Sequence, residues 1–482
     1  MGHNPTEYDA IVIGGGLGGL TCALALVNKG KKVRLLEKMH MVGGYQGYFI
    51  RKGFFFEPCF HSVAEASPDG AVARALASLK LNEVPAFVKL DPTARIIFPD
   101  EIFTMPSGFL DYTAVLKQKF PRETSGIDRM FRTMSDIYQG LQGFPGKKSV
   151  VERFRGMVFQ DILDESVSDK RLMAIISAFW GYLGLSPTRA SALVYSAFFA
   201  SLYTLGSYFP RSGITGLVKL VQQAIIERGG EISLKCPAKK ILIEQGKASG
   251  VILETGETIR ADAVISNTDA TTTFFHMVGE QHLPAVFVRQ LKKLKPTLSS
   301  FSVFLGVKNS GIIPPEIAAG NIIVFPEGDF HSHSEAILEG KLENAPFCLA
   351  VPTLIDSSLA PPDHHIISLH TAVPFRPPGT ACWKEKKGQY TERLIKLTEK
   401  VIPGITRQIV VKVAATPDTL VHFTGNYKGA VGGWDYTPDT DAHRPGNKTP
   451  VEGLWLTGHW TFPGVGVHSV IQSGCLTASM VS

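Results

Sequence analysis

Apolar positions near the start of the chain predict a strand, a helix and a second strand in close succession. Residues 11–13 form a short apolar run that ends on glycine, as a buried parallel strand does. Residues 20–27 carry apolar side chains at helical spacing, and Gly30 stands where the helix is expected to end. Apolar residues resume at 33–36, and Glu37 follows them. The pattern predicts a β-α-β unit of about thirty residues.

Three glycines fall in the turn between the first strand and the helix. Gly14, Gly16 and Gly19 have the spacing G-x-G-x-x-G. In such a turn the first glycine permits a tight bend, the second lets a pyrophosphate approach the backbone, and the third lets the helix pack on the strand. Glu37, at the end of the second strand, is placed to accept hydrogen bonds from ribose hydroxyls. The spacing predicts a dinucleotide site with a free 2′-hydroxyl, which FAD and NAD both satisfy.

A second glycine pair, Gly43 and Gly44, follows soon after Glu37. Such a pair recurs in flavoproteins, where the backbone must pass close to the cofactor, although an ordinary turn is an alternative explanation. The pair favours FAD over NAD.

Further signals of an α/β fold continue along the chain. An amphipathic helix is expected at 217–230, and short alternating strands with turns at Gly246 and Gly256 are expected over 231–267. Two later segments, 299–308 and 364–373, are also strand-like.

Near the C-terminus, residues 453–458 predict a strand that ends in glycine, and a helix is expected to begin at about 467. A strand, a glycine-rich turn and a helix N-terminus form a second anion site.

The 21 residues between Arg189 and Arg211 are uncharged and long enough to span a bilayer. Eight of them are Ser, Thr or Tyr, which favours a buried helix or the wall of a pocket over a membrane span.

Taken together, these motifs resemble the carotenoid isomerases, phytoene desaturases and retinol saturases, which are FAD-dependent proteins of the amine-oxidase-like superfamily. The chain departs from the usual family pattern at Tyr45, where arginine is common, at Glu57 and Cys59, where aspartate and glycine are usual, and at His459, where an acidic or small residue is usual. The resemblance rests on GGYQGYFIRKGFFFEPCFHSV (43–63), FWGYLGLSPTRASAL (179–193), YFPRSGITG (208–216), FTGNYKGAVGGWDY (423–436) and GLWLTGHWTFPGVGV (453–467).

The resemblance implies an α/β fold in which a Rossmann-type, glutathione-reductase-like FAD-binding domain carries an inserted α+β substrate domain. The FAD-binding domain would be discontinuous and built from residues 1–80, 207–275 and 416–482. The substrate-binding domain would comprise 81–206 and 276–415, with a helical part at about 110–206 and a sheet part at about 276–415.

The resemblance also implies where FAD binds. The adenine is expected near Glu37 and Ala238, the pyrophosphate near Gly458, and the flavin ring at the C-terminal glycine turn, where a helix end stabilises negative charge on the reduced ring. The predicted cofactor-binding residues are Gly14, Gly16, Gly19, Glu37, Lys38, Gly43, Gly44, Tyr45, Ala238, Gly458, Gly466 and Val467.

Two histidines are candidate catalytic residues. His61 ends a strand that is expected to pass near the flavin, and an imidazole titrates close to neutral pH. A hydrogen-bonded structural histidine is the alternative. His468 flanks the last glycine turn and could contact substrate or flavin.

The implied function is that of an FAD-dependent oxidoreductase or isomerase acting on C=C bonds of a long apolar polyene, such as a carotenoid or related isoprenoid. Isomerisation between cis and trans forms or saturation is favoured over desaturation. The 29 Phe and 12 Tyr could line an apolar tunnel or simply fill cores. A flavin amine or amino-acid oxidase and a non-catalytic flavin-binding relative are the two alternatives.

Composition and net charge limit the kinds of partner that the chain is expected to bind. Hydrophobic residues make up 44% of the chain and charged residues 19%, which excludes a disordered chain. The net charge of +6 is too small to indicate nucleic acid but would favour an anionic membrane surface. Basic amphipathic segments at 145–159 and 288–298 could lie on lipid headgroups, or could be ordinary solvated helix faces.

The six cysteines are scattered, and the start of the chain lacks the pattern of a secretory signal. We therefore expect a cytoplasmic protein with possible peripheral attachment to the membrane. The histidine pairs at 331–333 and 364–365 lack an evident third ligand, so no metal site is expected.

Overall fold

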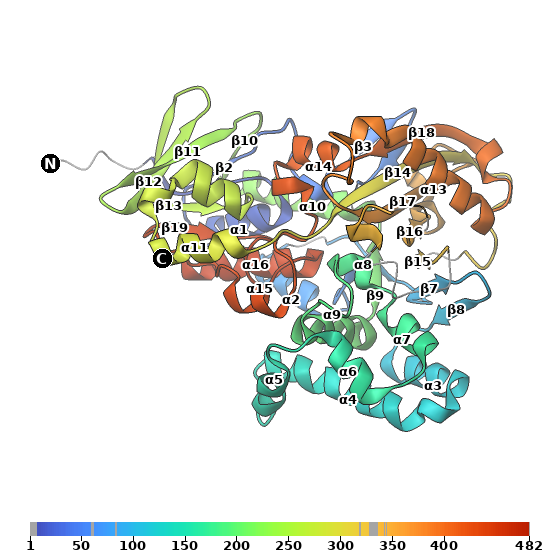
Figure 1. Cartoon of the computed structure of the whole chain (residues 1–482). Coiled ribbons are helices and arrows are strands. Elements are labelled where there is room, and N and C mark those ends of the chain that lie inside the picture. Colours follow the sequence, from blue (N-terminus) through green and yellow to red (C-terminus); the bar gives the residue numbers. More distant parts are fainter. Residues whose placement is uncertain are drawn as a thin grey trace.

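Two seven-stranded sheets and a group of helices make up the protein (Figure 1). The predicted catalytic residue His61, together with Cys59 and the histidine pair at 331–333, lies outside the residues that can be described. The computed structural model describes residues 7–58, 62–81, 84–317, 320–326, 336–341, 343 and 345–481.

The first sheet contains the predicted β-α-β unit. β1 (Tyr8–Ile13) pairs in parallel with β2 (Val33–Leu36), and α1 (Leu17–Val27) connects them. The predicted strands and turns of 231–267 are confirmed, since Gly246 and Gly256 both have positive φ between strands. The order is β10-β2-β1-β13-β12-β11, with β19 paired to β13, where β10 is Glu231–Ser233, β11 Ala238–Glu244, β12 Lys247–Leu253, β13 Thr258–Ser266 and β19 Leu454–Leu456.

Parallel pairing brings the ends of four strands together. β2, β1, β13 and β19 are successive parallel neighbours, so their carboxyl ends lie at one edge of the sheet. Gly14, Glu37, Asn267 and Gly458 follow these strands directly or within two residues. Ligands of open α/β sheets bind at this edge.

The second sheet has the order β18-β14-β17-β16-β15-β7-β8. The strands predicted at 299–308 and 364–373 are confirmed as β14 (Ser299–Lys308) and β17 (His364–Val373). The others are β7 (Ala94–Ile97), β8 (Ile102–Met105), β15 (Asn321–Val324), β16 (Phe347–Ala350) and β18 (Ile409–Ala415).

Two strands of this sheet, β7 and β8, come from outside the predicted sheet part at about 276–415. β7 pairs in parallel with β15, so a segment early in the chain joins strands that follow it by more than two hundred residues. Ala94 and Ile96 of β7 are buried with Ile322 and Ile323 of β15 in one core, which explains the pairing.

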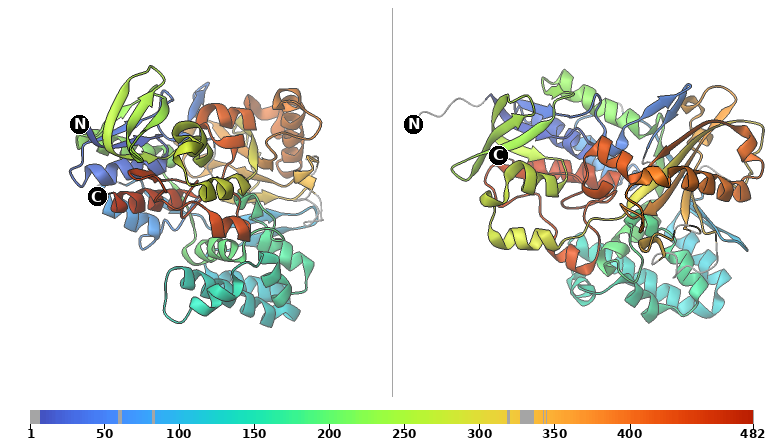
Figure 2. Two further views of the ribbon diagram at one scale, coloured as in Figure 1. Left: turned by 60° about the vertical axis from the view of Figure 1, so that its left-hand side comes forward. Right: turned by 45° about the horizontal axis from the view of Figure 1, so that its top comes forward.

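The helices between residues 109 and 205 form a lobe beside the second sheet, and the views in Figure 2 agree on this arrangement. The buried helix predicted after Arg189 is confirmed as α9 (Ala192–Leu205). Among the residues described, no helix is sufficiently long and apolar to span a bilayer. The other helices of the lobe are α3 (Phe109–Lys119), α4 (Thr124–Leu141), α5 (Lys148–Phe154), α6 (Phe159–Ser166), α7 (Lys170–Ser177) and α8 (Trp180–Leu183).

Shorter elements connect the sheets. A hairpin of β3 (Phe49–Arg51) and β4 (Phe54–Phe56) precedes a three-stranded sheet of β5 (Val63–Ala64), β9 (Ser207–Pro210) and β6 (Phe87–Lys89). The remaining helices are α2 (Ala71–Ser78), α10 (Gly213–Glu227), α11 (Ala285–Lys293), α13 (Lys387–Val401), α14 (Pro417–Thr424), α15 (Pro438–His443) and α16 (Val467–Met480).

α1 and α16 pack closely although they lie near opposite ends of the chain. At Gly474 of α16, an added methyl group would overlap the Thr21 hydroxyl of α1 and lie 2.6 Å from the carbonyl oxygen of Gly18. Only glycine lets the two backbones approach this closely. The contact fixes the middle of α16 against the first turns of α1.

We expect Gly474→Ala to destabilise the protein by about 1–3 kcal/mol, because the methyl group must displace backbone in a close-packed core. Denaturant unfolding measures the loss. Gly388→Ala is the matched control, since Gly388 is also helical but a methyl group added there would meet no atom within 4 Å. Equal unfolding midpoints for the two variants would contradict the packing argument.

Candidate functional site

A cavity of about 1090 Å³ runs from the carboxyl edge of the first sheet to the second sheet, α8 and α9. This volume is at the upper end of the range for ligand pockets. At one end, which we call the nucleotide end, the cavity is lined by Gly14, Gly16, Glu37, Gly43, Ala238 and Asn267. The part beside the second sheet, which we call the inner arm, is lined by Phe179, Trp180, Tyr182, Phe198, Leu202, Ile323, Phe347, Cys348 and His370.

Bare backbone lines the nucleotide end. Gly14 has φ +98°, a left-handed conformation that favours glycine, and Gly16 is the N-cap of α1. The Gly43 N–H donates to the carbonyl of Gly15 over 2.8 Å, which brings the second glycine pair against the first turn. At Gly14 and Gly16 a pyrophosphate could therefore approach the backbone beside the N-terminus of α1 without meeting a side chain of these two residues.

Glu37 is buried and holds the two segments around it. Its carboxylate accepts hydrogen bonds from the N–H groups of Gly15 (2.7 Å) and Met39 (2.8 Å). Glu37 also lines the cavity. It is thus placed to accept hydrogen bonds from ribose hydroxyls while its backbone partners fix its orientation.

The two predicted glycine-rich junctions meet in space. A methyl group added at Gly18 would lie 2.9 Å from the Gly458 Cα and 2.8 Å from Asn267 Oδ1. Gly466, the N-cap of α16, lines the same cavity as Gly16, the N-cap of α1. Two helix N-termini, from opposite ends of the chain, therefore face one cavity.

The structure separates the predicted residues into two groups. Gly19 and Gly458 do not line the cavity: a methyl group at Gly19 would overlap the Gly14 carbonyl oxygen, and one at Gly458 would overlap Asn267 Oδ1, so both glycines serve close backbone packing. The predicted residues that line the cavity are Gly14, Gly16, Glu37, Lys38, Gly43, Gly44, Tyr45, Ala238, Gly466, Val467 and His468.

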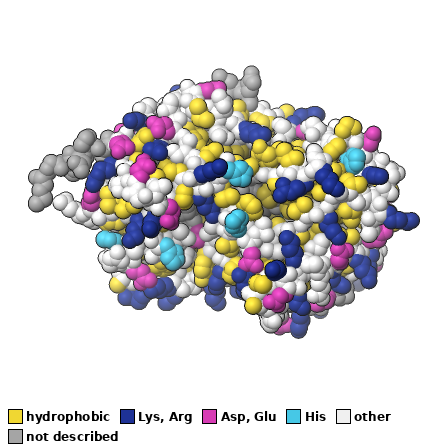
Figure 3. All heavy atoms as spheres, turned by 90° about the horizontal axis from the view of Figure 1, so that it is seen from above, with side chains coloured by type: hydrophobic (Ala, Val, Ile, Leu, Met, Phe, Trp, Pro, Cys, Tyr) yellow, Lys and Arg dark blue, Asp and Glu magenta, His cyan; other side chains and the backbone are white. Residues whose placement is uncertain are grey.

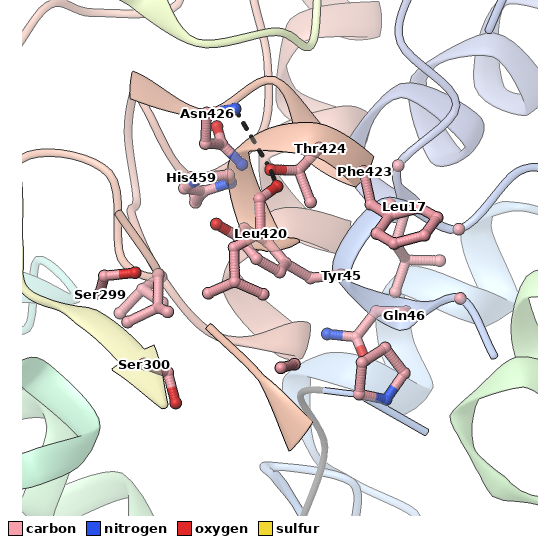
Figure 4. Close-up of a pocket in the computed structure, with 18 of the residues that line it drawn as sticks. Leu17, Tyr45, Gln46, Ser299, Ser300, Leu420, Phe423, Thr424, Asn426 and His459 are labelled. Carbon is pink, nitrogen blue, oxygen red and sulfur yellow. Dashed lines mark hydrogen bonds between the residues drawn. The ribbon is translucent and has the colours of Figure 1, made fainter. Parts of the chain in front are cut away.

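Tyr45 and His459, two departures from the family pattern, lie together in the cavity wall (Figure 4). The Tyr45 hydroxyl donates to the Ala430 carbonyl over 2.8 Å, and its ring meets the His459 ring edge to face at 5.8 Å. Burial, with a further contribution from nearby Arg444, lowers the pKa of His459 to about 4. The imidazole is neutral at pH 7, so it adds no positive charge to the cavity wall.

His468 is the second residue of α16 and lines the cavity. Its Nε2 lies 3.1 Å from the Ser469 hydroxyl. Burial lowers its pKa to about 4. The predicted catalytic role of His468 is therefore limited to that of a neutral imidazole at pH 7.

The inner arm is mainly aromatic and aliphatic, and it contains a histidine that the sequence analysis did not select. His370 is buried on β17, and its Nδ1 lies 2.9 Å from the Ser302 hydroxyl of β14. The two residues are directly opposite each other in the strand pairing. Alternation along the predicted strand 364–373 could have indicated its face, but not that this face borders a cavity.

Glu57, another departure from the family pattern, caps α10. Its carboxylate accepts hydrogen bonds from the Thr215 N–H (2.9 Å) and hydroxyl (2.8 Å). Burial raises its pKa to about 7, although these hydrogen bonds act in the opposite direction. Pro58, the next residue, lines the cavity, so Glu57 anchors the cavity wall to α10.

These residues fit an extended FAD. The nucleotide end offers bare backbone and a helix N-terminus to a pyrophosphate and a carboxylate to a ribose, and the α16 N-terminus lies further along the same cavity.

Comparison with known proteins agrees with this geometry. A family profile described as "Flavin containing amine oxidoreductase" matches residues 17–482. The chain belongs to this family. FAD is its cofactor, and the predicted α/β flavoprotein fold is confirmed.

This flavin-containing oxidoreductase is similar to two named enzymes and to one solved structure. It is 29% identical to the chloroplastic prolycopene isomerase of Daucus carota, over 99% of this chain and 80% of that protein. It is 26% identical to the all-trans-retinol 13,14-reductase of Danio rerio, over 94% and 82%. A solved oxidoreductase from Methanosarcina mazei shares its fold, with a TM-score of 0.69 at 20% identity over 98% of this chain and 99% of that one.

We expect Glu57→Gln to alter how stability depends on pH. Because the pKa of Glu57 in the folded protein, about 7, lies above its ordinary value of 4.5, the folded state retains a proton that the unfolded chain has lost between these values. The wild type should therefore lose up to about 3 kcal/mol relative to the variant as pH rises from 5 to 8.

Denaturant unfolding at several pH values measures this difference. Glu254→Gln, which changes an exposed carboxyl group, is the control and should follow the wild type. Parallel curves for Glu57→Gln and wild type would show that Glu57 carries no such proton.

Proposed function

We propose that this flavoenzyme acts on C=C bonds of a long apolar polyene, a carotenoid or related isoprenoid. The observation that carries the proposal is the inner arm, whose walls are aromatic and aliphatic. Among the described residues that line the whole cavity, Glu37 is the only Asp or Glu, and it belongs to the nucleotide end. A cationic amine would have no carboxylate partner in this inner arm, which supports an uncharged substrate.

In this proposal the cavity divides between cofactor and substrate. Gly14 and Gly16 approach the pyrophosphate, Ala238 lies by the adenine, and the turn before Val467 lies by the flavin ring. Bound FAD supplies two-electron chemistry at an alkene. The segments carrying the first sheet (1–80, 207–275 and 416–482) form the FAD-binding domain, and 81–206 with 276–415 form the substrate-binding domain.

The side chains of the inner arm would exclude water and hold the polyene extended against the flavin. Phe179, Phe198 and Leu202 come from the helical lobe, and Ile323 and Phe347 come from the second sheet. An apolar chain clamped between a helix layer and a sheet is desolvated along its length, which favours binding by the hydrophobic effect. The identity of 29% to a prolycopene isomerase, against 25% to two phytoene desaturases, supports isomerisation ahead of desaturation; the preference for saturation over desaturation stays a prediction.

We expect the purified protein to be yellow and to bind polyenes. Anaerobic titration of the holoenzyme with carotenes and retinoids should perturb the polyene or flavin absorption. Product mass with pre-reduced flavin then separates saturation, which adds two hydrogens, from isomerisation, which leaves the mass unchanged. Putrescine is the control; amine turnover with peroxide release, and no response to any polyene, would favour an amine oxidase instead.

We further propose peripheral attachment of this protein to an anionic membrane at the mouth of the cavity. Ile50 of β3 and Phe423 of α14 both line the cavity, yet they are 51% and 50% exposed. Three exposed basic residues lie near these two. Arg51 and Lys52 follow Ile50 in the chain, and Lys38 Nζ donates a hydrogen bond to the carbonyl of His422, the residue before Phe423. Figure 3 shows hydrophobic side chains interspersed with Lys and Arg over the upper face, where Figure 1 places β3 and α14. An apolar substrate could then enter directly from lipid.

We expect the wild type to float with vesicles that contain phosphatidylglycerol, and less with neutral vesicles or in high salt. The double variant Ile50→Ser, Phe423→Ser should reduce flotation several-fold. Leu110→Ser is the matched control, because Leu110 is 77% exposed but lies in the helical lobe. Equal losses in both variants, or no flotation of the wild type, would contradict this attachment site.

A further inference from the structure

A row of polar side chains crosses the second sheet on the face that borders the inner arm. Ser302 of β14 is opposite His370 of β17, and His370 is opposite Cys348 of β16. Residues paired directly across neighbouring strands have their side chains on the same face. Two members of this row, His370 and Cys348, line the cavity.

The imidazole of His370 is held in one orientation. Its Nδ1 lies 2.9 Å from Ser302 Oγ, and its ring meets the Phe304 ring edge to face at 5.5 Å. Ser300 Oγ lies 3.2 Å from Ser302 Oγ and extends the polar row. A hydroxyl can donate or accept, so Ser302 can support the neutral imidazole and also the imidazolium.

We propose that His370 is a catalytic residue that exchanges a proton with the substrate, and that Ser302 positions it. This inference rests on the proposed C=C chemistry and applies where that chemistry adds or removes a hydrogen pair rather than isomerises the alkene. Adding a hydrogen pair to an alkene places a hydride on one carbon and a proton on the other, and removing the pair reverses both transfers. FAD, with an external two-electron donor or acceptor, accounts for the hydride; a protein group in a water-poor arm must account for the proton.

The other titratable groups of the described cavity wall are less suited to this role. Burial raises the pKa of Cys348 to about 12 and that of Tyr182 well above its ordinary value, so both keep their protons near neutral pH. His459 in the C-terminal glycine turn and His468 at the start of α16 lie outside the inner arm, and burial lowers the pKa of both to about 4. The remaining charged or titratable residues of the described wall are not among the residues of the inner arm: Glu37, Lys38, His40, Tyr45, Tyr48, Arg51, Cys236 and Lys387.

The test compares His370→Gln with His365→Gln. Glutamine keeps a hydrogen-bonding side chain but cannot titrate. His365 lies on the same strand but, five residues away, on the opposite face, where its Nδ1 is 3.0 Å from the Thr353 hydroxyl. FAD content and the affinity for the polyene are measured first, by flavin absorbance and by the shift of polyene absorption, so that a folding defect is recognised.

The holoenzyme, pre-reduced with dithionite under anaerobic conditions, is then mixed with the polyene that the wild type binds, between pH 6 and 9. We expect His370→Gln to bind FAD and polyene normally but to react about 100-fold or more slowly, without the pH dependence of the wild type. Ser302→Ala should react about tenfold more slowly, with a shifted pH midpoint. His365→Gln should stay within about threefold of the wild type, as expected away from the chemistry.

Two outcomes overturn the inference and are distinguishable. If the wild type converts a polyene and His370→Gln does so within threefold of His365→Gln, or is slower with an unchanged pH profile, His370 is not the proton-exchanging residue while the proposed function stands. If the wild type converts no polyene, both fail together.

Discussion

The close approach of α1 and α16 is the contact on which the rest of the site depends. Gly474 lets α16 lie against Thr21 and Gly18 of α1, and Gly458 lies against Gly18 on the turn before it. Each helix places its N-terminus at the same cavity. Because the positive end of a helix dipole acts only over its first turn, two such ends can act on one extended ligand only if both helices begin at the cavity that holds it.

Local spacing in the sequence predicted most of the first sheet, because a β-α-β unit with its glycine turn is formed by residues close together in the chain. The same holds for β14 and β17, whose apolar runs coincide with the observed strands. β7 and β8 were not assigned to the second sheet, because their partner β15 is distant in the chain and only the shared core brings them together.

The site residues show the same limit. Spacing selected the glycines correctly as positions of close approach, but it could not distinguish those that face a ligand, such as Gly16, from those that face another backbone, such as Gly19. The sequence did not indicate His370 as a site residue, because it lies at the site only through the face of β17 that borders the cavity. Which face borders the cavity depends on how the sheet packs against the helical lobe. The place of His61 stays a prediction.

Burial sets the charge of the site as strongly as residue identity does. His459 and His468 would be partly charged in water at pH 6.5, yet in this wall they are neutral. Glu57 holds a proton far above the ordinary range of a carboxyl group. Among the described residues of the cavity wall, Glu37 at the nucleotide end is the one anionic side chain, whereas the inner arm is mainly aromatic and aliphatic. Such an environment separates a polar cofactor from an apolar substrate within one continuous space.

The pairing of β19 with β13 also affects how the protein is made. A ribosome releases the chain in order, so β1, β2 and β13 emerge well before residues 454–480 supply the last parallel strand and α16. Until then the carboxyl edge of the sheet and the apolar side of α1 stay uncovered, and such surfaces are prone to aggregation. The part of the cavity wall that α16 supplies exists only after this late closure, so the complete flavin site forms last, and bound FAD would stabilise the closed chain by mass action.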